Sequence, residues 1–159
     1  MKLYIKQAVF SLIDRFEVFD EEGNAKYYVE GELFSWGKKL HVYDRNHSEV
    51  IYIQQKLFSL FLPKYHIFVR GQQIAEIVKE LSFLKPHYTV DGLGWDIKGD
   101  FWSHEYCILR NDEMVTSISK KWFTWGDSYM LDIYDNRDEL PALAVILAID
   151  CVVAQQSKN

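Results

Sequence analysis

Short polar turns recur along this chain of 159 residues, at a spacing of roughly 18 to 25 residues. Each turn follows an apolar or aromatic residue and separates two stretches in which apolar and polar residues alternate. An alternation with a period of two is typical of β-strands, so the turns predict a series of hairpins. The turns are residues 20–24, 44–47, 70–73, 91–94, 110–113 and 135–138.

Aromatic segments, which we call elbows, lie between these turns. After most elbows the alternation resumes, so each elbow joins one hairpin to the next. The pattern predicts about a dozen strands. The elbows are residues 10–12, 33–37, 57–61, 81–84, 100–103 and 122–126, and the alternation resumes at 16–18, 40–42, 65–67, 88–90, 106–108 and 131–133.

The last segment, residues 140–154, is apolar on every face and predicts a helix that is either buried or spans a membrane. Asn136 or Asp138 can cap it, and Pro141 suits its first turn. A run of about 15 residues reaches about 22 Å, which is shorter than a bilayer core of roughly 30 Å. Asp150 also interrupts the run, so we expect a buried helix and no transmembrane span.

A buried helix needs a structure that surrounds it. About a dozen strands in successive hairpins can close into a barrel that is too wide for its own side chains to fill, and a helix can fill this lumen. We therefore predict a mainly β protein, a closed antiparallel barrel of about twelve strands around a central helix at about 139–155. A lumen filled in this way weakens any proposal of a lipocalin-like cavity. We expect residues 1–159 to form one domain, since 48% of them are hydrophobic.

Location and broad class follow from charge and cysteine content. Residues 1–7 carry charge where a signal peptide is apolar, so we expect a cytoplasmic protein. Cys107 and Cys151 are far apart in apolar surroundings and fit free thiols. The net charge of −5 argues against wholesale binding to nucleic acid.

Residues with catalytic or metal-binding chemistry form no recognisable motif. The five histidines are scattered and are interpreted as isolated strand or turn residues, so no metal site and no cofactor are predicted. Gly92 and Gly94 lie in a hairpin turn with no helix after it, which excludes a nucleotide-binding loop. Ser103, His104 and Glu105 are neighbours without a nucleophile elbow, so no catalytic residue is predicted.

Several segments together resemble the LURP-one-related family, and specifically its small bacterial members. The resemblance covers nearly the whole chain and rests on residues 16–20, 28–31, 119–123 and 143–150. It implies the fold of the tubby C-terminal domain and the phospholipid scramblases, a barrel of twelve strands around a hydrophobic C-terminal helix. Tubby domains bind phosphoinositide head groups through basic residues, so the resemblance implies an intracellular binding or scaffold domain and no enzyme. It transfers no functional residue to this sequence.

In an up-and-down barrel all elbows meet at one rim, the elbow rim, and all turns meet at the other, the turn rim. Lysines interleaved with tryptophans at the elbow rim suit an anionic phospholipid head group, which would hold the protein peripherally at a membrane, or a protein partner. The alternative is that the aromatics plug the barrel end and the lysines are its solvated fringe. The candidate residues are Lys38, Lys39, Lys64, Lys85, Lys120, Lys121, Trp36 and Trp125, whereas acidic residues dominate the turn rim.

Asp150 is the other candidate site residue. A carboxylate near the end of an enclosed helix faces desolvation and an unfavourable helix dipole, so it needs a partner. We interpret it as a structural anchor that accepts bonds from strand amides, Tyr or Arg, and a proton-carrying role is the alternative.

The leading hypothesis is a non-enzymatic binding domain, and a small-ligand-binding protein or an enzyme with an unrecognised site stays open beside it. The ligand, the oligomeric state and the pathway are not indicated by the sequence.

Overall fold

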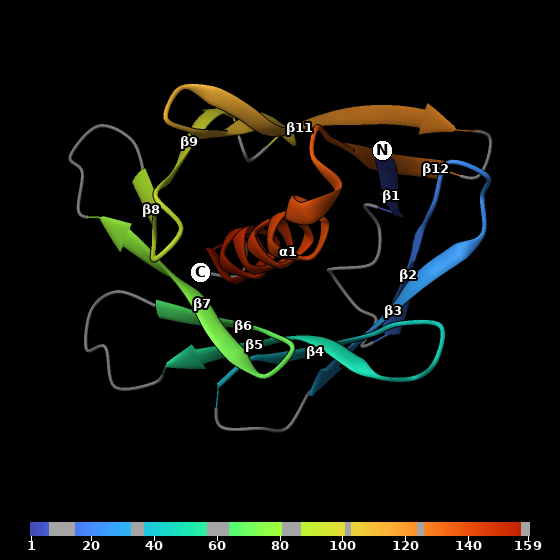
Figure 1. Cartoon of the computed structure of the whole chain (residues 1–159), viewed down its shortest axis with the longest axis horizontal. Coiled ribbons are helices and arrows are strands. Elements are labelled where there is room, and N and C mark those ends of the chain that lie inside the picture. Colours follow the sequence, from blue (N-terminus) through green and yellow to red (C-terminus); the bar gives the residue numbers. More distant parts are fainter. Residues whose placement is uncertain are drawn as a thin grey trace.

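The computed structural model describes residues 1–6, 15–32, 37–56, 64–80, 87–100, 103–123 and 126–156. Within these ranges twelve antiparallel strands close into a barrel, and one long helix runs through it (Figure 1). This arrangement confirms the predicted fold class. The strands are β1 (Lys2–Lys6), β2 (Arg15–Phe19), β3 (Ala25–Glu32), β4 (Lys39–Tyr43), β5 (Glu49–Lys56), β6 (Lys64–Val69), β7 (Gln72–Glu80), β8 (His87–Asp91), β9 (Trp95–Asp100), β10 (Glu105–Arg110), β11 (Glu113–Phe123) and β12 (Gly126–Ile133).

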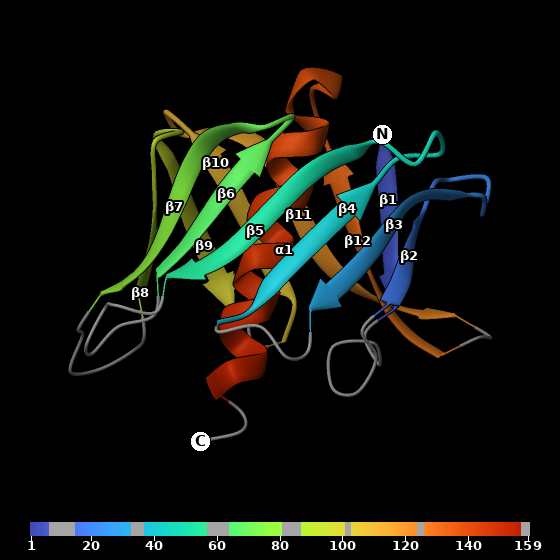
Figure 2. The same cartoon turned by 90° about the horizontal axis from the view of Figure 1, so that it is seen from below.

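Each strand pairs with the next one along the chain, and β1 closes the barrel by pairing with β12. The closing register places Lys2 opposite Asp132 and Lys6 opposite Ser128. All six predicted turns lie at one rim, because five join the two strands of a hairpin and the sixth, residues 135–138, joins the end of β12 to α1. Most elbow residues lie outside the described residues, but the strand ends that flank them meet at the opposite rim (Figure 2).

The period-two alternation separates an inner from an outer barrel face. Val29, Val42, Ile53, Ile67 and Ile77 are almost completely buried. Their neighbours along the strands are partly exposed. The apolar half of each strand therefore faces the lumen, which is where the helix lies.

Helix α1 (Glu139–Gln156) occupies the lumen, and Figure 1 shows it at the centre of the barrel. The residues from Ala142 to Val152 are all at most 3% exposed. A helix without a polar face has no side that water would favour, so full enclosure suits it. The structure thereby confirms the predicted burial of this helix, including Leu143, Val145, Ile146, Leu147, Ile149 and Val152.

The start of the helix differs in detail from the expectation. A 3₁₀ turn (Asn136–Asp138) precedes α1. The N-cap of this 3₁₀ turn is Asp135, whose side chain accepts a bond of 2.9 Å from the Arg137 amide. Asp135 is extended and therefore has the backbone geometry that a capping residue needs. Asp138 is used differently, since its carboxylate accepts a 2.5 Å bond from Arg110 on β10.

We expect Leu147→Ala to lower the free energy of unfolding by about 2 to 5 kcal/mol, because Leu147 is 0% exposed and its truncation leaves a cavity. Urea unfolding followed by circular dichroism measures the change. Met114→Ala is a control, since Met114 is 40% exposed on β11 and should change stability by about 0.5 kcal/mol or less. Equal midpoints for the two variants would contradict tight packing of the helix.

Candidate functional site

The elbow rim is formed in the described residues by strand ends and by the last turns of α1. Strand β3 ends at Glu32 and β4 begins at Lys39. Strand β5 ends at Lys56 and β6 begins at Lys64. Figure 2 shows α1 entering the barrel at the turn rim and extending past the strand ends at the elbow rim. The C-terminal end of the helix therefore belongs to the same surface as the predicted lysines.

The lysines at this rim are not equivalent. Lys39 donates to Glu32 at 3.1 Å, and Lys64 donates to Glu76 at 2.8 Å. These bonds raise the pKa of both lysines above the usual value. Part of the predicted positive charge is therefore neutralised at the protein surface.

Lys38 and Lys121 have no carboxylate partner among the described residues, and Lys121 is exposed. Lys120 is half-buried, and its backbone amide donates to Glu105 at 2.9 Å. The other predicted residues, Lys85, Trp36 and Trp125, lie outside the described residues. The structure thus places five of the predicted lysines on this side of the barrel: Lys38, Lys39, Lys64, Lys120 and Lys121.

Among the basic residues whose side chains the structure describes at this rim, sequence reasoning missed Lys56 and Arg15. Lys56 is exposed at the end of β5 and has no acidic partner in the described part of the chain. Arg15 begins β2 with a side chain that is 78% exposed and lies 3.5 Å from Glu30. Both flank an elbow, so the rule that placed the other lysines would have found them.

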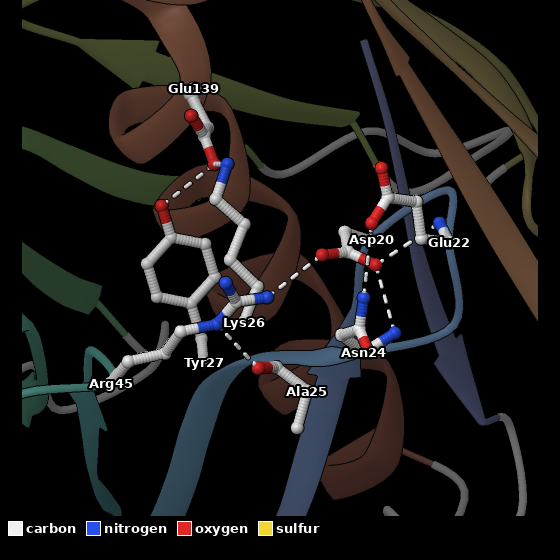
Figure 3. Close-up of polar contacts among 8 residues, drawn as sticks. All are labelled: Asp20, Glu22, Asn24, Ala25, Lys26, Tyr27, Arg45 and Glu139. Carbon is white, nitrogen blue, oxygen red and sulfur yellow. Dashed lines mark hydrogen bonds and ion pairs between the residues drawn. The ribbon is translucent and has the colours of Figure 1, made fainter.

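The turn rim also carries many charges, and several of them bond to one another. Glu139 accepts bonds from Lys26 at 2.5 Å and from Tyr27 at 2.7 Å, so both β3 residues hold the start of the helix (Figure 3). Arg45 joins its own turn to the neighbouring one by donating to Asp20 at 2.8 Å and to the Ala25 carbonyl at 2.9 Å. These acidic side chains are used to close the turns and to hold the helix.

Asp150 lies near the other end of the helix and is 3% exposed. One carboxylate oxygen accepts a bond from the Tyr129 hydroxyl, and the other lies 3.2 Å from Nε2 of His104. The rings of His104 and Tyr129 stack at a centroid distance of 4.4 Å. Burial and the neighbouring carboxylate raise the pKa of Tyr129 well above its usual value, so the hydroxyl keeps its proton and donates.

The interpretation of the histidines as isolated is wrong for three of them. His104 contacts Asp150 from the turn between β9 and β10, where its φ of 56° is left-handed. His66 lies 2.8 Å from Glu76, and His41 lies between two carboxylates. The partners are distant in sequence or on another strand, so spacing along the chain carried no signal. Among the described residues, no group of three or more His, Cys, Asp or Glu side chains could hold a metal ion.

His41 contacts Glu32, the carboxylate that also pairs with Lys39. Its Nδ1 lies 2.6 Å from Glu49, and its Nε2 lies 3.0 Å from Glu32. Burial would lower the pKa of His41, but the bonds to Glu49 and Glu32 outweigh it, so the pKa lies above the usual 6.5. The bonds from His41 and Lys39 in turn lower the pKa of Glu32.

A closed antiparallel barrel with a helix in its lumen defines a tubby-like fold. A solved structure of a protein from Arabidopsis thaliana has the same fold, with a TM-score of 0.67, 14% sequence identity, and coverage of 95% of this chain and 90% of that one. The LURP-one-related family model matches residues 1–150, so this chain belongs to the LURP-one-related family. An uncharacterized protein of Bacillus subtilis, YxjI, is 37% identical over 153 residues, which cover 96% of this chain and 94% of the relative.

We expect Asp150→Ala to destabilise the fold by about 3 to 5 kcal/mol, because it leaves His104 and Tyr129 without their buried acceptor. Asp150→Asn keeps one oxygen acceptor and should cost less, about 1 to 2 kcal/mol. Urea unfolding of both variants measures the difference. Asp96→Ala removes an exposed carboxylate and is the control. Equal losses for the alanine and asparagine variants would show that the bonds of Asp150 do not anchor the helix.

We expect the stabilising contribution of His41 to depend on pH. A raised folded-state pKa means that this contribution is complete below about 6.5, the unfolded value, and is lost as pH rises through the folded value. The stability difference between the native protein and His41→Gln should therefore shrink as the pH rises. Urea unfolding midpoints of the two proteins, measured at pH values below and above 6.5, test this prediction. A stability difference that grows with pH would contradict a charged His41 ring that bonds to both Glu49 and Glu32.

Proposed function

We propose that this protein is a non-enzymatic binding domain that associates peripherally with anionic phospholipid head groups through the elbow rim. The main support for this proposal is that the two rims differ in whether their basic side chains have acidic partners. Lys38, Lys56 and Lys121 at the elbow rim have no acidic partner among the described residues, whereas Lys26, Arg45 and Arg110 at the turn rim each lie against a carboxylate. A surface with uncompensated lysines is the one that an anionic ligand would favour.

The filled lumen supports a binding domain over an enzyme or a carrier of a small apolar ligand. The helix occupies the barrel interior with side chains that are almost completely buried. A buried ligand would have to displace part of this core, at the cost of the packing that holds the barrel. Binding at the outside of the barrel requires no such change.

The affinity of such a surface should be low and dependent on salt. Each lysine near an anionic surface contributes about 1 kcal/mol, so a few lysines give a weak and reversible association. The attraction falls off over a Debye length of about 10 Å at 0.1 M salt. Weak binding of this kind suits a protein that exchanges between the cytoplasm and a membrane surface.

The test is sedimentation with vesicles of phosphatidylcholine, with and without phosphatidylserine. We expect the native protein to sediment with the anionic vesicles at low salt. The variant Lys38→Ser, Lys56→Ser, Lys121→Ser should lose most of this binding, and Lys39→Ser, Lys64→Ser should lose less because those lysines are already paired. The control Lys2→Ser, Arg70→Ser, Arg137→Ser removes the same number of charges at the turn rim.

All variants are first compared by thermal unfolding, so that only folded proteins of equal stability are used. Equal loss of binding in the two triple variants would show that net charge, and no particular surface, sets the attraction. Absence of native binding at low salt would remove the lipid proposal and leave a protein partner as the ligand of the elbow rim.

A further inference from the structure

Strands β8 and β9 are joined differently from all other neighbouring strands. Their only ladder pair in the described residues is Val90 with Trp95, next to the turn. Every other neighbouring pair in the barrel is joined through two or more residue pairs in the same ranges. The two strands therefore separate as they run from the turn toward the elbow rim.

The separation leaves backbone groups of both strands without ladder partners among the described residues. If the register continued, Thr89 would lie opposite Asp96, and His87 opposite Lys98, but neither pair forms. On an extended strand the amides and carbonyls of alternate residues point to each neighbour. Two strand edges therefore face one slot, the space between residues 87–89 and residues 96–98.

Strand β9 is held on the far side of the slot by β10. The two strands pair over the full length of β9, from Trp95 with Arg110 to Asp100 with Glu105. Gly99 has a φ of 123°, and a Cβ there would lie 2.6 Å from the Glu105 carbonyl oxygen. Only glycine allows this approach, so the sequence commits β9 to β10.

A cleft of about 540 Å³ takes in the part of the slot nearest the turn, and its volume is within the range of about 300 to 1,000 Å³ that ligand sites occupy. Its apolar lining comes from Val90, Trp95 and Ile97. Exposed carboxylates of Asp91 and Asp96 also line it. Lys98, the basic residue of the lining, lies 3.5 Å from Asp112, which offsets part of its charge.

Trp95 forms one wall of the slot with an unused donor. Its side chain is 4% exposed, and the Arg110 guanidinium lies over its ring at 5.5 Å. The indole Nε1 is buried without a hydrogen-bond partner in the described part of the chain. A buried N–H of this kind is costly unless an acceptor reaches it.

We infer that the slot is a binding site for an extended, basic peptide segment of a partner protein, which adds to the sheet between β8 and β9. Open strand edges supply main-chain hydrogen bonds, which is how sheets recognise peptides. Apolar side chains of the peptide face Val90 and Ile97, and its basic side chains face Asp91 and Asp96. This site differs from the lysine surface of the elbow rim and requires no lipid.

The experiment uses a short capped peptide of alternating lysine and valine, without lipid. Amide hydrogen exchange is followed by NMR at residues 87–89 and 96–98, together with the indole N–H signal of Trp95. We expect the amides that face the slot to exchange rapidly in the free protein and, with saturating peptide, to slow by on the order of tenfold or more. The Trp95 signal should shift at the same peptide concentrations.

Two control peptides and two variants separate the contributions. The same peptide with N-methylated backbone amides should not bind, and the same peptide with glutamate in place of lysine should bind more weakly. Asp96→Lys should weaken binding of the lysine peptide, whereas Glu113→Lys, an equal charge change on an exposed residue at the turn rim, should not.

Three results would overturn the inference. Slow exchange of the slot amides in the free protein would show that β8 and β9 pair in solution. Equal binding of the N-methylated peptide would show that no strand is added. A concentration-dependent dimer that protects the same amides would show that the slot takes a second copy of this chain.

Discussion

The structure depends on the enclosure of a helix that has no polar face. Water disfavours every side of the segment from Ala142 to Val152, and each of these residues is buried in the lumen. The barrel needs the helix equally, because twelve strands close around a space that their own side chains do not fill. Closure also removes most of the free edges that a set of hairpins would otherwise present, the slot between β8 and β9 being the exception. Helix and barrel are therefore expected to form together, which makes the last segment of the chain part of the core of all the earlier ones.

Polar bonds at the two ends of the helix fix its position along the barrel axis, which apolar packing alone would leave less specified. At the turn rim, Glu139 bonds to β3 and Asp138 bonds to β10, so neighbouring helix-start residues reach different parts of the wall. At the elbow rim, Asp150 faces Tyr129 of β12 and His104, which lies in the elbow connection between β9 and β10. A carboxylate near a helix C-terminus is unfavourable to the dipole, so these bonds offset a cost that the sequence accepts there.

The parts that could be predicted from the sequence are those set by local chemistry. The six turns follow from polar and glycine-rich stretches, and the helix follows from an apolar run with Pro141 in its first turn. The bond between His104 and Asp150 joins residues 46 positions apart and follows from no pattern. The pairing of Lys39 with Glu32 depends on the register across an elbow, so counting lysines overstated the positive charge. The slot was also missed, because residues 88–90 alternate like any paired strand.

The slot widens toward the elbow rim, but its acidic lining lies beside the turn between β8 and β9, so the two candidate surfaces carry charges of opposite sign. The unpaired lysines lie at the ends of β5 and β11 and just before β4, whereas Asp91 and Asp96 line the slot between β8 and β9. An anionic membrane would repel the slot and attract the lysines, so it should orient the barrel with the slot tilted away from the lipid. A basic peptide would be attracted by the acidic slot and repelled by the lysines. Under the two proposals, the separation of charge around the barrel would let one small domain hold a lipid surface and a protein segment at the same time, without competition between them.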